Sequence, residues 1–149
     1  MRRNLPMILV RLIVGLVFLL EGALKFIRPE ELGAGRFASF GLPVPHLLAP
    51  LAGGLEILGG AAILLNLYAG DAALVLLLFI LAALAAKLPI GLGRPLGPFP
   101  LPASVLHYGW LSFCYEVRIE LLLLFSLVAI LIDSGLRMGH RRRWYQSGL

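Results

Sequence analysis

Apolar residues dominate this chain in four long runs, which are separated by segments rich in proline, glycine or charge. A helix that crosses the hydrocarbon core of a membrane needs about 20 mostly apolar residues. The runs therefore predict membrane-spanning helices at residues 5–26, 47–67, 72–88 and 108–132. The simplest arrangement of four consecutive spans is an all-α, up-down four-helix bundle.

Helix-breaking and capping residues predict where these spans begin and end. Pro29 should end the first span, Asp71 should cap the third and Pro89 should stop it. The stretch 89–102 holds five prolines and three glycines, so we expect no regular element there. Lys87, close to the end of a short span, is expected to extend its ammonium group to the membrane interface.

The composition agrees with a single integral membrane domain over residues 1–149. Of the 149 residues 60% are hydrophobic and 14% are charged, and the mean hydropathy is +0.93. Soluble domains carry about 25% charged residues. The single cysteine excludes a disulfide within the chain. The basic start resembles a signal peptide, but the apolar run continues and has no small-residue cleavage site, which indicates a retained span.

Positive charge is concentrated at the two ends of the chain. Six arginines lie there, against three in the loops that connect the first span to the second and the third to the fourth: Arg2, Arg3, Arg137, Arg141, Arg142 and Arg143 against Arg28, Arg36 and Arg94. Cytoplasmic loops of membrane proteins carry an excess of lysine and arginine. The distribution predicts that both termini, including a basic tail at 133–149, lie in the cytoplasm. Anionic lipid is the expected partner of the tail, and nucleic acid is not expected.

Charged residues within the spans are the candidates for function, because a charge at bilayer depth is rarely left unpaired. In the first span, helical periodicity places a mixed set on one face: Arg11, Gly15, Phe18, Gly22 and Lys25. The two glycines of this face allow another helix to approach closely. Glu21 lies one turn before Lys25 and can pair with it locally.

Glu56 lies near the middle of the second span and has no basic residue one turn away. It must therefore pair with a residue of another helix or be protonated, because desolvation disfavours the charged form. Lys25 is the first candidate partner and Arg11 the second. Such a pair is explained equally well as a structural link between helices and as part of a binding site.

The fourth span carries Ser112, Glu116 and Glu120 on one face, while Arg118 points nearly opposite. Stacked carboxylates repel each other unless one is protonated or a cation intervenes. Lys87 is expected at a similar depth. In the predicted orientation the charges of three spans share the outer half of the membrane: Glu21, Lys25, Lys87, Glu116 and Glu120.

Motifs of other site classes are not found in the sequence. No pair of histidines or of histidine and glutamate has the spacing of a metal site, so no metal is expected, and His46 and His107 are interpreted as interfacial residues. A phosphate-binding glycine loop and a nucleophile elbow are also not found.

Three segments together resemble the DoxX family of small membrane proteins. The first span, RLIVGLVFLLEGALKF, is similar to the opening R-x3-G-x2-F-x3-G-x2-K-[LF] pattern of the family. FGLPVP at 40–45 resembles its outer loop, and LAGGLEILGG at 51–60 resembles its second-span glutamate segment. The resemblance weakens after residue 67, where Asp71 replaces an arginine that is frequent in the family and the usual S-L-D ending becomes DSG at 133–135.

The resemblance implies a four-helix membrane subunit, and some members of the family are linked to quinone-dependent thiosulfate oxidation or to thiol-redox complexes. Our first hypothesis is therefore a quinone-binding subunit of a membrane oxidoreductase in the cytoplasmic membrane of a prokaryote, with no covalent cofactor and with electrons supplied by a partner or substrate. Glu56, Lys25 and Arg11 are its candidate catalytic residues. The candidates for contact with the quinone are Gly22, Glu21, Glu116, Glu120 and Lys87.

The second hypothesis is an assembly or partner-binding protein without enzymatic activity, in which the charges fix the bundle. A carrier for small solutes ranks lower because the sequence has no internal repeat. Both leading hypotheses leave self-association open.

Overall fold

The computed structural model is all-helical in the part of the chain that it describes, residues 5–103 and 105–147, with side chains described up to residue 135. The helices are α1 (Leu5–Ile27), α2 (Ala34–Ser39), α3 (Pro45–Leu64), α4 (Ala69–Leu92) and α5 (Trp110–Ser147). The predicted all-α class is confirmed. Among the described residues, α1, α3 and α4 are long and apolar enough to cross a membrane. In α5, side chains are described only up to residue 135, and Glu116, Arg118 and Glu120 lie in its first three turns.

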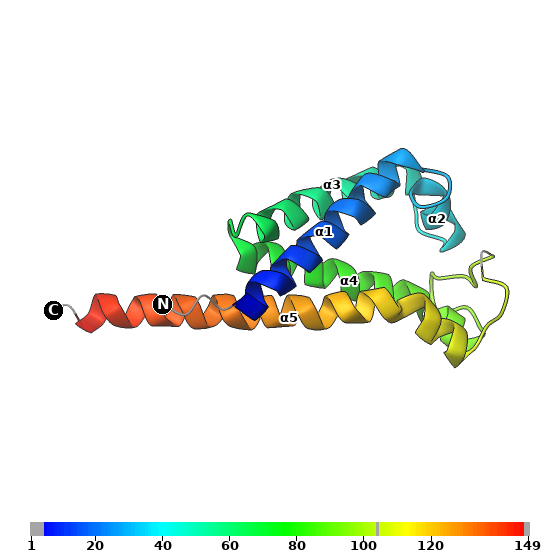
Figure 1. The fold of residues 1–149 in the computed structure, drawn as a ribbon. Helices are drawn as coiled ribbons and strands as arrows, with labels where there is room; N and C mark the ends of the chain where they lie inside the picture. Colours follow the sequence, from blue (N-terminus) through cyan, green and yellow to red (C-terminus); the bar gives the residue numbers. More distant parts are fainter. Residues whose placement is uncertain (1–4, 104, 148–149) are drawn as a thin grey trace.

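The four long helices form two pairs, as Figure 1 shows: α1 packs along α3, and α4 packs along α5. The pairs meet where α1 begins and diverge toward α2. We call the end that holds α2 and the 93–109 loop the α2 end. The opposite end, with the turn between α3 and α4, is the Asn66 end. The apolar core lies between the pairs and takes side chains from all four helices, among them Phe18, Ile63, Leu76, Leu127 and Ile130.

Glycines bring the backbones of α1 and α3 into contact. A Cβ atom added at Gly22 would lie 2.6 Å from the carbonyl oxygen of Gly53, and one added at Gly60 would lie 2.8 Å from that of Gly15. The helices are antiparallel and the glycines of each are two turns apart, so both contacts form in one register. Small residues at helix interfaces permit such close approach in membranes. The predicted glycine face of the first span is therefore confirmed, and its partner is α3.

Some of the predicted boundaries are wrong. α4 does not stop at Pro89 but continues to Leu92, where Gly93 adopts a left-handed conformation with φ of 62°. Proline inside a helix removes one hydrogen bond, and packing against neighbouring helices compensates for this in membrane proteins; Pro89 is fully buried. Asp71 lies in the first turn of α4 and makes no side-chain cap.

Two helical segments were not expected from the sequence. α2 forms within the loop after α1, and α5 continues to Ser147 through the region predicted as a tail. The stretch 133–147 contains no proline, so nothing in the backbone stops the helix there.

The glycine contacts predict that alanine substitution changes stability very differently at two glycines of α3. Gly60→Ala places a methyl group against the Gly15 backbone and should lower the free energy of unfolding by about 1–3 kcal/mol. A Cβ at Gly54 meets nothing within 4 Å. Gly54→Ala should therefore leave stability unchanged or raise it slightly, because alanine favours the helix. Thermal unfolding of the purified protein in detergent measures both, and equal effects would show that the α1–α3 contact is looser than described.

Candidate functional site

Four ion pairs connect different helices in the described part of the chain. Three of them involve α5, and all join elements distant in sequence: Arg11–Asp133 (α1 to α5), Lys25–Glu56 (α1 to α3), Arg36–Glu116 (α2 to α5) and Lys87–Glu120 (α4 to α5). A further pair, Arg28–Glu31, is exposed and local. The charges of the spans are thus used mainly to join helices.

Lys25 and Glu56 form the most enclosed of these pairs. The Lys25 Nζ lies 2.6 Å from the Glu56 Oε2, and the two side chains are only 9% and 5% exposed. The Lys25 ammonium also donates to the Glu21 carbonyl at 3.4 Å. The glycine contact between Gly22 and Gly53 closes the helices beside the pair. The predicted partner of Glu56, Lys25, is confirmed.

Arg11, the second candidate partner of Glu56, lies elsewhere. Its Nη2 donates to the Asp133 Oδ2 at 2.7 Å, and its Nη1 donates to the Asn66 side chain. Arg11 is about 21 Å from Lys25 along α1, at 1.5 Å per residue. This group at the Asn66 end was not predicted from the sequence. The sequence feature that could have indicated it is the carboxylate of Asp133, which lies at the end of the last apolar run.

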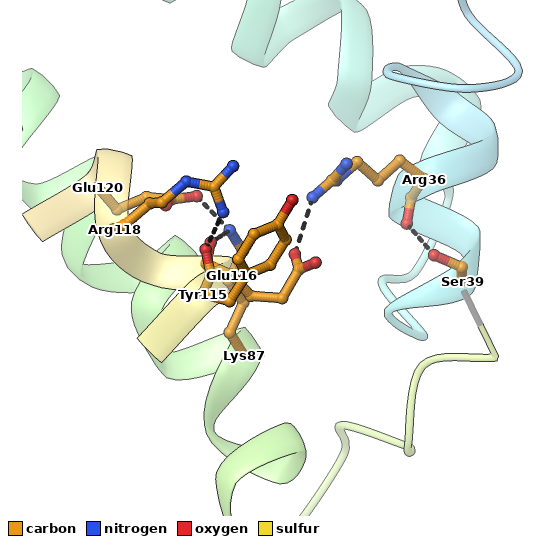
Figure 2. Close-up of polar contacts among 7 residues, drawn as sticks. All are labelled: Arg36, Ser39, Lys87, Tyr115, Glu116, Arg118 and Glu120. Carbon is orange, nitrogen blue, oxygen red and sulfur yellow. Dashed lines mark hydrogen bonds and ion pairs between the residues drawn. The ribbon is translucent and has the colours of Figure 1, made fainter. Parts of the chain in front are cut away.

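Lys87 is buried between α4 and α5 and does not extend to the interface, contrary to expectation. Its Nζ donates to the Glu116 carbonyl at 2.7 Å and pairs with the Glu120 carboxylate (Figure 2). These acceptors on α5 are within its reach, so the side chain satisfies its charge inside the bundle.

The two stacked carboxylates of α5 are separated by two cations. Lys87 forms an ion pair with Glu120. Arg36, from α2, places its Nη2 3.2 Å from the Glu116 Oε2 (Figure 2). Of the two alternatives for these carboxylates, protonation of one or the presence of a cation, the structure shows a cation beside each. Arg36 was missed because α2 was not predicted, and its position in a loop suggested solvent.

The polar residues expected in one cluster therefore form two groups at the α2 end. Glu21, Lys25 and Glu56 belong to the α1–α3 pair, and Lys87, Glu116 and Glu120 belong to the α4–α5 pair. The Arg36–Glu116 contact connects the two helix pairs at the end where they diverge.

A hollow with apolar walls and several polar groups lies beside Glu116. Its volume is about 400 Å³, and it is lined by Val105, Leu106, His107, Leu111, Ser112, Tyr115 and Glu116. We call it the Glu116 hollow. A second, apolar hollow of about 580 Å³ lies between α3 and α4 and includes Gly54, Leu55 and Val75. Neither is lined by Glu56 or Lys25. The Glu116 hollow, which combines space with convergent polar groups, is the candidate functional site.

Within residues 5–103 and 105–135, no three histidine, cysteine, aspartate or glutamate side chains are grouped to hold a metal ion.

The family model of DoxX matches residues 7–87, just over half of the chain. The chain belongs to the DoxX family, and it is an integral membrane protein. It is similar to a protein of Mycobacterium tuberculosis described as an uncharacterized membrane protein, with 46% identity over 77 residues. That match covers 52% of this chain and 47% of the relative, so the chain matches about half of the relative's length. No solved structure matches the chain.

The enclosed Lys25–Glu56 pair predicts a large loss of stability on neutralising one member. Glu56→Gln leaves the Lys25 charge buried without a counter-charge, and breaking such a pair typically costs about 3–5 kcal/mol. Glu30→Gln, in the exposed loop after α1, is the matched control and should change stability by less than about 0.5 kcal/mol. Denaturant or thermal unfolding compares the two.

The double variant Lys25→Met with Glu56→Leu should recover much of that loss, because no buried charge remains. A double variant as unstable as Glu56→Gln would contradict the electrostatic explanation.

Proposed function

We propose that the chain is a quinone-binding subunit of a membrane redox system that oxidises thiol or sulfur compounds. It crosses the cytoplasmic membrane of a prokaryote four times, with both termini in the cytoplasm. Membership of the DoxX family supports the membrane location, and the Glu116 hollow supports the binding function. Electrons come from a partner subunit or a substrate.

The fourth crossing is supported by the packing of α5. This helix lies along α4, which is long and apolar enough to span a membrane, so the two cross together. The charges in the first three turns of α5 are mostly neutralised, because Glu116 pairs with Arg36 and Glu120 with Lys87. A paired charge is tolerated in a span far better than a single one.

The Glu116 hollow fits a quinone headgroup better than the Lys25–Glu56 pair does. Small-molecule pockets have volumes of about 300–1,000 Å³ and combine apolar walls with a few oriented polar groups. The hollow, with its volume of about 400 Å³, meets both conditions. Lys25 and Glu56, in contrast, are 2.6 Å apart and enclosed by glycine contacts. Lys25–Glu56 and Arg11–Asp133 therefore stabilise the bundle in this proposal.

The observation that carries the proposal is that Glu116 both lines the hollow and binds cationic side chains of two other helices. Its carboxylate lines the hollow and binds Arg36, while its carbonyl accepts from Lys87. A bound quinone would supply two-electron, two-proton chemistry. Ser112 and Tyr115 can donate hydrogen bonds to its carbonyl groups, and His107 can donate from a ring nitrogen.

The second candidate is an assembly protein without a ligand. The four ion pairs favour this function, because their opposite charges neutralise each other. Joining the helices then explains their presence without a ligand. Only the quinone proposal requires a saturable ligand in the Glu116 hollow.

Binding of a short-tailed quinone analogue to purified protein tests the proposal. Wild type should bind saturably. Ser112→Ala and Tyr115→Phe should each weaken binding severalfold, because a neutral hydrogen bond contributes about 0.5–1.5 kcal/mol. Neither side chain takes part in the four ion pairs, so the fold should be retained.

Glu116→Gln should weaken analogue binding severalfold, because it removes the ion pair that holds Arg36 beside the hollow. Glu30→Gln serves as the control. Equal binding by wild type and all three hollow variants, or no saturable binding at all, would favour the assembly function.

The proposed orientation is tested by cysteine labelling in intact cells. Cys114 is first replaced by serine, and a single cysteine is introduced at Ala38 in α2 or at Leu67 in the α3–α4 turn, both exposed. A membrane-impermeant maleimide should label position 38 and spare position 67. The reverse pattern would place the termini outside.

A further inference from the structure

The outward face of α5 carries a regular stripe of exposed side chains. Its members recur at alternating intervals of four and three residues: Leu111, Tyr115, Arg118, Leu122 and Phe125. Four of them are 64–89% exposed: Leu111 89%, Tyr115 64%, Leu122 70% and Phe125 69%. We call this stripe the Arg118 face. A 4–3 repeat keeps one seam of a helix facing a neighbouring helix.

The Arg118 face points away from the bundle. Leu127, which is fully buried in the core, lies nine residues after Arg118, which corresponds to about 180° around a helix. Val117, Leu123 and Ile130 are buried as well and line the side of α5 that faces its neighbours. α5 therefore presents two seams, one of which is covered within the chain.

Arg118 is the unusual member of the uncovered seam. It lies eight residues after the first residue of α5, Trp110, which is about 12 Å along the helix axis. Its Nη1 donates to the Tyr115 carbonyl, and the guanidinium lies 3.8 Å from the centre of the Tyr115 ring (Figure 2). The arginine is thus held on the face by its own helix.

The carboxylates next to Arg118 in sequence are bound by other residues. Glu116 pairs with Arg36 and Glu120 with Lys87. In the part of the chain whose side chains are described, Arg118 makes no ion pair. A guanidinium that faces lipid within a span is unfavourable, and such charges normally meet a counter-charge.

We propose that the Arg118 face is a docking surface for a transmembrane helix of another protein that carries an aspartate or glutamate at the depth of Arg118. Charge complementarity selects this occupant. A second copy, related by a two-fold axis along the membrane normal, would place Arg118 opposite Arg118, and like charges repel most strongly where water is excluded. The proposal requires that α5 crosses the membrane, but it does not depend on quinone binding.

The lone cysteine provides a native reporter for this surface. Cys114 is exposed and lies one turn before Arg118, at the edge of the face. The full chain is reconstituted in phosphatidylcholine vesicles with a synthetic polyleucine transmembrane peptide. The peptide has one glutamate at the depth of Arg118 and one cysteine at the depth of Cys114, and a matched peptide has glutamine in place of the glutamate. Oxidative cross-linking to Cys114 reports docking.

The glutamate peptide should cross-link at a peptide concentration about tenfold lower than the glutamine peptide, which corresponds to about 1.4 kcal/mol. Arg118→Leu should abolish this preference and Arg118→Lys should retain part of it. Arg94→Leu, in the exposed loop before α5, should leave it unchanged. Because Arg118 is exposed, its variants should unfold at the wild-type temperature.

Three results would overturn the proposal. Equal cross-linking of the two peptides, or a preference that survives Arg118→Leu, would show that the arginine does not select a carboxylate. Efficient Cys114–Cys114 disulfide formation between copies in the absence of peptide would identify a second copy as the occupant. Loss of the preference when phosphatidylglycerol replaces part of the phosphatidylcholine would identify lipid phosphate as the partner of Arg118.

A separate labelling experiment tests whether α5 crosses the membrane. If a membrane-impermeant maleimide labels cysteines placed at both ends of α5 from the same side of the vesicle, the helix does not span the membrane. The docking proposal then fails together with the four-span topology. Quinone binding in the Glu116 hollow is measured without the peptide and is judged on its own result.

Discussion

A charged side chain within a bilayer must find its counter-charge inside the protein, because lipid cannot solvate it. This constraint determines which helices become neighbours here. Lys25 ties α1 to α3, Arg11 ties α1 to α5, and Lys87 ties α4 to α5. Each pair joins helices at one depth, so together they fix register as well as adjacency. Hydrophobic packing alone distinguishes such arrangements weakly, since apolar helix faces pack similarly in many registers.

The two helix pairs are held together by different chemistry. Gly15 and Gly22 bring α1 against the α3 backbone, which leaves the Lys25–Glu56 pair little room to change partners. In the α4–α5 pair, Lys87 binds the Glu120 carboxylate and the Glu116 backbone carbonyl, and the α2 end of this pair opens into the Glu116 hollow. Arg36 is the contact between the pairs at this end. A ligand in the hollow would therefore contact the α4–α5 pair, which is less tightly packed than the α1–α3 pair. It would do so at Glu116, the residue whose contact with Arg36 joins the two pairs.

Much of the architecture follows from patterns within single segments. The apolar runs located the long helices, the spacing of Gly15 and Gly22 identified the packing face, and the isolation of Glu56 in its span pointed to Lys25. These features depend on the helical period and on the cost of burying a charge. Both can be read from one stretch of sequence.

Features that depend on how distant segments meet were less predictable. Arg36 reached Glu116 only because a short helix formed in a loop, and Arg11 chose Asp133 because the two helix pairs converge at the Asn66 end. Pro89 continued its helix because buried packing outweighed the missing hydrogen bond. In each case a local preference was overridden by a tertiary contact that the sequence pattern does not encode.

The charges of α5 point in two directions, so some need counter-charges inside the bundle and one needs a counter-charge outside it. Glu116 and Glu120 turn toward the bundle and receive Arg36 and Lys87, while Arg118 between them turns away. A chain that functioned alone in lipid would gain by having a leucine there. The proposed redox function also requires a second protein, because electrons must reach the Glu116 hollow from outside the chain. The hollow and the Arg118 face share Leu111 and Tyr115, so a helix docked on this face would border the site that it serves.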